Sequence, residues 1–429
     1  MITRPLFAAY RLASSAIGPF APALLKWRER RGKEDARRIG ERMARPGQLR
    51  PEGRLAWLHG ASVGEGLALL PLVERLTARG MNVLVTTGTV SSATILAARL
   101  PAGALHQYVP LDVPNFVERF LDHWQPDIVL FAESELWPNM LAAVDERGLP
   151  LVLVNARLSP RSFRRWQKAP NVIHEMLDRF DICLAQSQGD AARLMQLGAA
   201  RVQVTGNLKY DAAPPPADGA AVAHLSAQIG ARPVWVAAST HAGEEDLAFA
   251  AHQKLTQRFP KLLTVVAPRH AARGDEVAAQ ARARGLRVAQ RSRGEPIQRD
   301  IEVYVADTMG ELGLFYRLTS LIFVGKSLLE KGGGQNPIEP AKLGCAILHG
   351  PNVQNFEEVY AELGAAGGAC SVADGPQLAR ALERLLSDPG LLRKMARAAA
   401  ETVDGLGGAT LRIEAALEPY FTQMLIEHG

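Results

Sequence analysis

The chain has 429 residues, 47% of them hydrophobic and 22% charged, which is the balance of an ordinary globular protein large enough for two or three domains. A net charge of +5 favours an anionic partner without distinguishing nucleic acid, membrane or nucleotide substrates. Three cysteines, Cys183, Cys345 and Cys370, cannot all pair and lack metal-type spacing, which excludes a disulfide framework and indicates a reducing compartment.

An apolar segment at residues 6–25 precedes a stretch dense in arginine and lysine at residues 26–45. The apolar segment approaches the ~20 residues of a membrane-spanning helix, but an arginine, two serines and two prolines interrupt it. "APA" resembles a signal-peptide cleavage site, whereas the basic residues beyond it favour the cytoplasmic side. We expect residues 1–30 to lie on, or dip into, the cytoplasmic face of a membrane. The expected membrane-facing side chains are Leu6, Phe7, Leu12, Ile17, Phe20, Leu24 and Leu25.

The alternative for this segment is an amphipathic helix that packs on its own domain or on a partner.

From residue 55 onward, apolar runs alternate with helix-like segments. The runs of the first half are "LAWLHG", "NVLVTTGT", "DIVLFAES", "PLVLVNARLS", "DICLAQS" and "VQVTGN". Short buried strands that alternate with helices indicate a parallel sheet covered on both faces. We assign this first Rossmann-like domain to residues 31–210.

A proline-rich polar stretch at residues 211–222 is typical of a linker. The alternation restarts beyond it, which predicts a second Rossmann-like domain at residues 223–400 and a helical tail at residues 401–429. The fold class is therefore α/β, with two Rossmann-like domains expected to face each other across a cleft. Because ligands of open α/β sheets sit at the carboxyl ends of the strands, the residues that follow each apolar run are the candidate site.

The run "HGASVGEG" follows the first apolar run and holds a single carboxylate, Glu65. Glycine-rich strand-to-helix turns bind anions through backbone N–H groups. However, no Lys-Ser/Thr pair completes a P-loop here, and a carboxylate would repel a phosphate. Glu65 is therefore either a first-turn acid that favours the positive end of a helix dipole or a group that acts on a substrate.

Two further runs carry polar groups. "ESELWPN" has Glu133 and Glu135 at positions i and i+2, which point the same way on an extended stretch and diverge if a turn begins there. The plainer alternative is that both are acids at a helix N-terminus. In "GGGQNPIEPA", Asn336 can cap a helix whose first position is Pro337, with Glu339 in the first turn. This is either a well-capped helix or a nucleotide site in which Glu339 binds ribose hydroxyls.

Eight motifs in this order resemble those of 3-deoxy-D-manno-octulosonic acid (Kdo) transferases: "LHGASVGEG", "FAESELWPN", "NARLSPRS", "TGNLKYD", "APRH", "DTMGELGLFY", "VGKSLLEKGGGQNPIEPA" and "HGPNVQNF". The similarity covers residues 31–420. It implies the two-Rossmann GT-B type of glycosyltransferase fold. It also implies inverting transfer of Kdo from CMP-Kdo to a sugar hydroxyl of a lipid A precursor, with release of CMP, in lipopolysaccharide biosynthesis.

The resemblance implies peripheral or monotopic attachment to the cytoplasmic side of the cell inner membrane, and nucleic acid is not among the implied partners. Glu65 matches the family's general base, and Glu133 and Lys209 match its transition-state stabilisers. The implied CMP site is formed by Pro268, Arg269, Met309, Gly310, Glu311, Asn336, Pro337, Ile338 and Glu339. This chain departs from commoner family members in having three glycines before the "QNPIE" run, where they have two.

No grouping of His, Cys, Asp and Glu has metal-ligand spacing, so we expect no catalytic metal and no cofactor other than the CMP-Kdo substrate. Two rival functions are compatible with the fold class. A sugar-nucleotide epimerase of the same fold would leave the N-terminal apolar and basic segment unexplained. A non-catalytic membrane protein that binds lipopolysaccharide precursors would not need Glu65, Glu133 and Lys209 together at strand ends.

Overall fold

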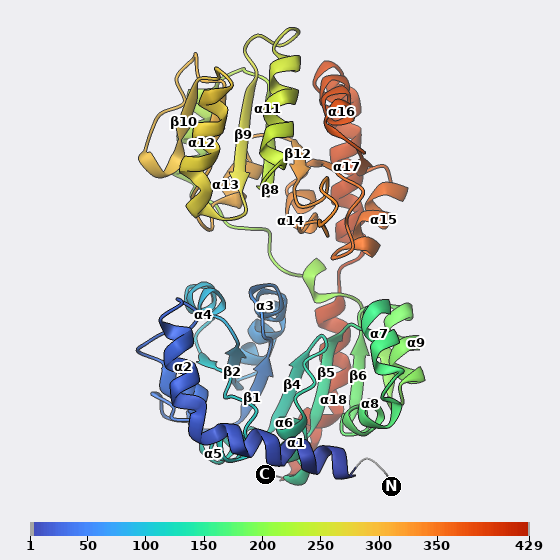
Figure 1. Ribbon diagram of the computed structural model, residues 1–429. Coiled ribbons are helices and arrows are strands. Elements are labelled where there is room, and N and C mark those ends of the chain that lie inside the picture. The colour runs from blue at the N-terminus through green and yellow to red at the C-terminus, as the bar shows by residue number, and fades with distance from the viewer. Residues whose placement is uncertain (1–3, 428–429) are drawn as a thin grey trace. The chain divides into compact units, whose positions relative to one another are not determined.

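The computed structural model describes residues 4–427 as two α/β units (Figure 1). The first unit comprises residues 1–212 and 407–429, and the second comprises residues 213–406. Each contains a seven-stranded sheet in which all the described pairings are parallel. The predicted α/β class with two Rossmann-like domains is confirmed.

The first sheet has the strand order β3-β2-β1-β4-β5-β6-β7. Its strands are β1 (Leu55–His59), β2 (Asn82–Thr87), β3 (Ala104–Tyr108), β4 (Ile128–Ala132), β5 (Leu151–Ala156), β6 (Ile182–Ala185) and β7 (Val202–Val204). The helices are α1 (Arg4–Ile17), α2 (Ala21–Glu29), α3 (Val63–Ala78), α4 (Val90–Ala97), α5 (Pro114–Trp124), α6 (Pro138–Glu146), α7 (Pro160–Trp166), α8 (Pro170–Leu177), α9 (Gln188–Gln196) and α18 (Ala409–Glu427). Short 3₁₀ turns are η1 (Gly18–Phe20), η2 (Ile39–Met43) and η3 (Leu208–Tyr210).

The second sheet has the order β10-β11-β9-β8-β12-β13-β14. Its strands are β8 (Val234–Thr240), β9 (Leu263–Pro268), β10 (Val288–Gln290), β11 (Val303–Val305), β12 (Leu321–Val324), β13 (Ala346–His349) and β14 (Ala369–Ser371). The helices are α10 (Gly219–Ile229), α11 (Glu244–Leu255), α12 (Gly274–Ala283), α13 (Leu312–Tyr316), α14 (Ile338–Lys342), α15 (Glu357–Ala365), α16 (Gly375–Ser387) and α17 (Pro389–Gly405), with 3₁₀ turns η4 (Ala271–Arg273) and η5 (Arg291–Arg293).

The apolar runs form central strands because helices cover both faces of each sheet. Every residue of β1 and β4 is buried. On one face of the first sheet, Trp57 packs against Phe120 and Phe131, with ring centroids 4.6 and 5.2 Å apart. The strand order reverses between β1 and β4 in the first sheet and between β8 and β12 in the second. At such a switch point the loops at the carboxyl ends diverge and leave space for a ligand.

The C-terminal residues belong to the first unit, which differs from the tail expected at residues 401–429. After α17, the chain returns and α18 packs on α3. Arg79 of α3 donates to Glu414 at 2.6 Å, and the Asp211 carboxylate accepts from the Gly408 N–H at 2.6 Å. The expected linker, residues 211–222, already includes the start of α10 at Gly219. The second unit therefore begins before the expected boundary at residue 223.

The N-terminal helices pack on the first unit. One of their sides is therefore that of an amphipathic helix packed on its own domain, which is the alternative given above for this segment. The Tyr10 hydroxyl donates to Asp112 at 2.9 Å, and the Asn139 amide donates to the Ser14 hydroxyl at 2.9 Å. Leu25, expected to face a membrane, is fully buried, and Phe7 packs half-buried against the core. Residues 1–3 of the expected segment lie outside the described residues.

The other side of these helices presents large apolar side chains to solvent. Those more than a third exposed are Leu6, Tyr10, Leu12, Ile17, Phe20, Leu24 and Trp27. Within residues 4–427, no helix combines the length and apolar character needed to cross a bilayer. Of the seven side chains expected to face a membrane, five are thus exposed to solvent: Leu6, Leu12, Ile17, Phe20 and Leu24.

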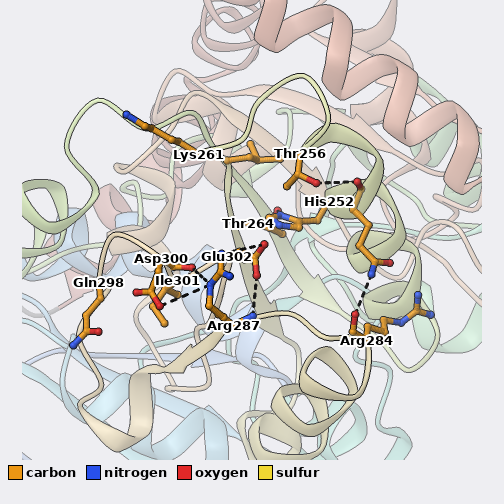
Figure 2. A network of polar contacts seen from close by, with 12 residues as sticks. His252, Thr256, Lys261, Thr264, Arg284, Arg287, Gln298, Asp300, Ile301 and Glu302 are labelled. Carbon is orange, nitrogen blue, oxygen red and sulfur yellow. Dashed lines mark hydrogen bonds and ion pairs between the residues drawn. The ribbon is translucent and has the colours of Figure 1, made fainter.

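A buried histidine in the second unit links α11 to β9 (Figure 2). The Nδ1 atom of His252 lies 2.8 Å from the Thr264 hydroxyl, and its Nε2 atom has no hydrogen-bond partner among the described residues. On the neighbouring β11 side, the Glu302 carboxylate accepts from the Arg287 N–H at 3.0 Å. Burial, with a contribution from the positive charge of Arg232, lowers the pKa of His252 to about 4.

We expect the free energy of unfolding to fall as the pH drops from about 6.5 towards 4, because His252 takes up a proton in the unfolded chain before it does so in the folded one. Between pH 7 and 5, His252 alone contributes about 2 kcal/mol to this loss. Guanidinium unfolding of the wild type and of His252→Gln at both pH values measures it. A His252→Gln variant that loses as much stability as the wild type would contradict the expectation.

Candidate active site

Glu65 lies in the first turn of α3, where the loop after β1 enters the helix. Ser62 is the N-cap, and its hydroxyl oxygen accepts from the Glu65 N–H at 3.3 Å. The Glu65 carboxylate in turn accepts from the Ala61 N–H and from the Ser62 hydroxyl, both at 2.7 Å. This reciprocal arrangement resembles a capping box, with the Ala61 N–H in place of the N–H of the N-cap residue. The first-turn position weighed from the sequence is therefore correct, and it fixes the carboxylate in one orientation.

The small residues of this loop allow the chain to pack closely around Glu65. A Cβ atom on Gly60 would lie 3.0 Å from the Glu65 Cβ atom, and one on Gly66 would lie 3.0 Å from the Leu96 side chain. A Cβ atom on Gly88, at the end of β2, would lie 3.0 Å from the Ala61 carbonyl oxygen. The glycines around Glu65 thus allow the loop after β1, the end of β2 and the Leu96 side chain of α4 to pack closely together.

The surroundings of Glu65 favour its protonated form. Burial is the largest cause that raises its pKa, and the charges of Glu133 and Glu135 raise it further. The hydrogen bonds from Ser62 and Ala61 oppose the rise without cancelling it. A carboxylate with a raised pKa is a stronger base, so Glu65 is suited to remove a proton from a hydroxyl group.

A turn begins at the end of β4 and separates Glu133 from Glu135, which settles the alternative left open by the sequence. The Glu135 N–H donates to the Ala132 carbonyl at 3.2 Å, and Glu133 has a left-handed φ of 55°. The Glu133 carboxylate accepts from the Lys209 ammonium at 2.7 Å. Neither acid belongs to a helix N-terminus, because α6 begins at Pro138.

Lys209 is positioned by two asparagines. Asn155, at the end of β5, accepts from the Leu208 N–H through its Oδ1 atom at 2.9 Å. Asn207 accepts from the Lys209 N–H at 3.0 Å and caps η3. The strand ends of β1, β4 and β5 and the turn η3 thus bring together the three predicted catalytic residues of the first unit.

His59 and Glu135 were not assigned from the sequence, although they adjoin the predicted residues. The fully buried His59, the last residue of β1, places its Nε2 atom 3.3 Å from the Glu135 carboxylate, and the Trp137 indole donates to that carboxylate at 2.6 Å. Burial alone would raise the pKa of Glu135, but the approach of His59 outweighs it and lowers the pKa. The i and i+2 spacing of the two acids was the available signal.

The second unit holds the predicted CMP-binding residues in three loops. Pro268 ends β9, and the Arg269 N–H donates to the Thr240 carbonyl at 2.9 Å. Met309 is 66% exposed and is followed by Gly310, with a φ of 80°. The Glu311 carboxylate accepts two hydrogen bonds from Arg291, at 2.7 and 3.0 Å, and these lower its pKa.

The third loop leads into α14. The Asn336 side chain accepts from the Ile338 N–H at 3.0 Å, and its amide donates to Glu339 at 3.3 Å. The helix begins at Ile338 rather than at the predicted Pro337, which occupies the N-cap position. Glu339 is in the first turn as expected.

Each of the three glycines before this loop is sterically required. A Cβ atom on Gly332 would lie 2.6 Å from the Lys326 carbonyl oxygen, and one on Gly333 would lie 2.7 Å from the Asn355 side chain. Gly334 has a φ of 73°. The additional glycine is thus part of a tightly packed loop that precedes Asn336.

Glu244 was also missed by the sequence analysis. This carboxylate is 1% exposed at the start of α11, and it accepts from the backbone N–H groups of His241, Lys326, Ser327 and Leu328 at 2.7–3.1 Å. It therefore joins the loops after β8 and β12 at the switch point of the second sheet. The available signal was the run "STHAGEE" at residues 239–245, which stands at the end of an apolar run. Among residues 4–427, no group of three His, Cys, Asp or Glu residues is placed to hold a metal ion.

Solved structures share this architecture. A putative UDP-N-acetylglucosamine 2-epimerase from Listeria monocytogenes matches with a TM-score of 0.60 and 17% identity, over 86% of this chain and 98% of that one. A glycosyltransferase from Rickettsia africae matches with a TM-score of 0.59 and 14% identity, over 86% of this chain and 98% of that one. The fold defines a protein of the GT-B class, in which two Rossmann-like domains occur in one chain.

Sequence comparisons narrow this class. The profile described as "3-Deoxy-D-manno-octulosonic-acid transferase (kdotransferase)" matches residues 37–212. The 3-deoxy-D-manno-octulosonic acid transferase of Bordetella pertussis is 37% identical over an alignment of 428 positions, which covers 94% of this chain and 98% of that protein. That of Haemophilus influenzae is 32% identical over an alignment of 383 positions, which covers 86% of this chain and 87% of that protein. The chain belongs to the Kdo transferase family, which confirms the resemblance seen in its motifs.

Proposed function

We propose that this protein transfers Kdo from CMP-Kdo to a sugar hydroxyl of a lipid A precursor, with inversion, in lipopolysaccharide biosynthesis. The observation that carries the proposal is the held Glu65 carboxylate, whose pKa is raised beside the Glu133–Lys209 pair in a chain of the Kdo transferase family. Glu65 takes the proton of the acceptor hydroxyl. The acceptor oxygen bonds to the anomeric carbon, and the bond from that carbon to the phosphate oxygen of CMP breaks.

Glu133 and Lys209 are proposed to stabilise the transition state. Positive charge develops on the sugar ring as the bond to CMP breaks, and the Glu133 carboxylate can offset it. The Lys209 ammonium, which is held at 2.7 Å from Glu133, can attract the sugar carboxylate or the departing phosphate. The left-handed backbone of Glu133 fits this role, since strained residues concentrate at functional sites.

One assay distinguishes this function from both rivals. The protein is incubated with CMP-Kdo, with and without a lipid A precursor, and CMP release is followed. Release that depends on the acceptor supports transfer, whereas a change in a nucleotide sugar without acceptor supports an epimerase. Binding without turnover supports the non-catalytic alternative.

We propose that the reaction needs no metal or cofactor. The rate of CMP release should therefore persist in EDTA. A loss of rate in EDTA that a divalent ion restores would contradict this.

We propose that the second unit binds CMP through the loops of Arg269, Glu311 and Glu339. Replacement of Glu339 by alanine should raise the Kd for CMP by about 10- to 100-fold, since a hydrogen bond to a charged group contributes about 1.5–3 kcal/mol. Calorimetric titration with CMP measures this. Glu357→Ala is the matched control, because Glu357 is an exposed first-turn acid of α15. Equal affinities for wild type and Glu339→Ala would leave Glu339 as a residue of the helix alone.

We propose a monotopic attachment to the cytoplasmic side of the inner membrane through the exposed side of α1, η1 and α2. Deletion of this segment would remove the buried Leu25 and the hydrogen bond from the Tyr10 hydroxyl to Asp112, so substitutions at exposed positions are the better test. Serine at Leu12, Ile17 and Phe20 should reduce flotation with anionic liposomes several-fold, because each side chain loses up to about 1.5–3 kcal/mol of burial. Serine at the exposed Leu49, Met195 and Leu411 is the control triple. Equal flotation of both triples would place the membrane contact elsewhere.

A further inference from the structure

The helix α7 carries three arginines on one side, and Lys168 lies in the turn that follows its last residue, Trp166. Arg161, Arg164, Arg165 and Lys168 follow the spacing i, i+3, i+4 and i+7, and all four are exposed. Phe163 and Trp166 are directed to the interior and pack against the core of the first unit. We call the four cations the α7 cationic face. The helix thus anchors its apolar side and presents a purely basic side to solvent.

This face lacks acidic partners. No Asp or Glu occurs in the sequence between Glu146 and Glu175. Among the described residues, the four side chains make no hydrogen bond or ion pair. Like charges at i and i+4 destabilise a helix by about 0.2–0.5 kcal/mol per pair. Three unneutralised arginines on one side of α7, with Lys168 directly after the helix, are therefore suited to an anion supplied from outside the chain.

The basic stretch after the N-terminal segment is different. Three of its seven arginines are neutralised within the domain, since Arg28 and Arg42 pair with Glu34 at 2.7 and 2.9 Å and Arg38 pairs with Glu41 at 2.8 Å, and four acidic residues occur within the stretch. The sequence assigned attraction for anionic groups to that stretch. The structure adds a second set of exposed cations on and directly after α7, in a part of the sequence that contains no acidic residue.

The α7 cationic face follows the carboxyl end of a strand, at the same end of the first sheet as the catalytic carboxylates. Helix α7 follows β5, and α3 with Glu65 follows β1, so both begin at the same edge of the parallel sheet (Figure 1). The Arg157 N–H donates to the Glu133 carbonyl at 3.2 Å, which joins the loop before α7 to the turn after β4. The Ser159 side chain caps the helix, so this short connection is ordered.

We propose that the α7 cationic face binds the phosphate groups of the acceptor glycolipid. This inference rests on the proposed function and names the feature of the acceptor that is recognised. Lipid A precursors are glucosamine disaccharides that carry phosphates, and arginine binds phosphate through two parallel N–H groups. The bilayer itself is a poorer fit, since no large apolar side chain is exposed between residues 157 and 170, whereas the exposed side of α1, η1 and α2 has seven.

The test uses the triple variant Arg161→Gln, Arg164→Gln, Arg165→Gln in the full chain. The probes are an acylated glucosamine disaccharide 1,4′-bisphosphate in detergent micelles and the same molecule after removal of its phosphates. We expect the variant's KM for the bisphosphate to rise about tenfold or more, because several charge-assisted hydrogen bonds are lost. KM for the dephosphorylated acceptor should change far less. The control triple is Arg393→Gln, Lys394→Gln, Arg397→Gln, which removes three exposed cations from α17.

An unchanged KM for the bisphosphate would overturn the proposal, and so would an equal rise for both acceptors. Reduced flotation with anionic vesicles, with KM in detergent unchanged, would also overturn it and assign the face to the bilayer. Binding of both glycolipids is measured without CMP-Kdo as well. If the proposed function fails, the wild type will bind the glycolipids but will not release CMP from CMP-Kdo. The inference is then still tested by whether the wild type prefers the bisphosphate over the dephosphorylated glycolipid more strongly than the variant does.

Discussion

Replacement of Glu65 by glutamine is expected to lower kcat for Kdo transfer by about 10²- to 10⁴-fold, the usual contribution of a general base. A sugar hydroxyl is a weak nucleophile at neutral pH, and the glutamine side chain cannot accept its proton. Glutamine retains a carbonyl oxygen that can accept from the Ala61 N–H, so the loop should stay folded. Steady-state assay of CMP release, with the Kd for CMP measured in parallel, checks the result.

Glu74→Gln is the matched control, because Glu74 is an exposed acid on the same helix. A correctly folded Glu65→Gln enzyme with turnover near that of the control would remove Glu65 from the mechanism. The pH profile adds a second readout. Because the pKa of Glu65 is raised, kcat should fall as the pH drops through that raised value. Glu135→Gln removes one of the charges that raise it, so the acid limb should move to lower pH.

The sequence predicted the class of fold well because most strands are short apolar runs buried on both faces. Strand β3 was missed, since its sequence "ALHQY" contains two polar residues. These are accommodated by specific partners: the His106 ring bonds to Thr87 at 2.9 Å and lies 3.1 Å from the Arg38 guanidinium. Such partners come from distant parts of the chain, and a local pattern of hydrophobicity does not contain them.

The return of α18 to the first unit was missed for a related reason. Its helical pattern was evident, but the choice of domain depends on contacts such as that of Arg79 with Glu414, 335 positions apart. For the candidate site, too, some residues could be predicted from the sequence and others could not. Motifs placed Glu65, Glu133 and Lys209 at strand ends. The partners His59 and Glu244 required the three-dimensional arrangement, because each contacts a group from another strand end.

Replacement of Lys209 by alanine should lower kcat by about 10²- to 10³-fold, the range seen when one preorganised group is removed from a transition-state site. Glu65, Glu133 and Glu135 form a strongly acidic end of the sheet, and the Lys209 ammonium is bonded to Glu133 at 2.7 Å. Without this cation the carboxylates would repel the anionic donor sugar and its departing phosphate.

Three variants separate this electrostatic role from a structural one. Lys209→Arg retains the charge and should recover part of the lost rate, whereas Lys209→Met, which retains the apolar stem, should not. Because Glu133 and Lys209 are in direct contact, their effects on the activation free energy should be non-additive by about 1 kcal/mol or more in a double-mutant cycle with Glu133→Gln. Rates are measured at saturating CMP-Kdo and acceptor. Full additivity in the cycle would show that the ammonium acts independently of Glu133. Equal rates for Lys209→Met and Lys209→Arg would show that Lys209 supports only the fold of η3.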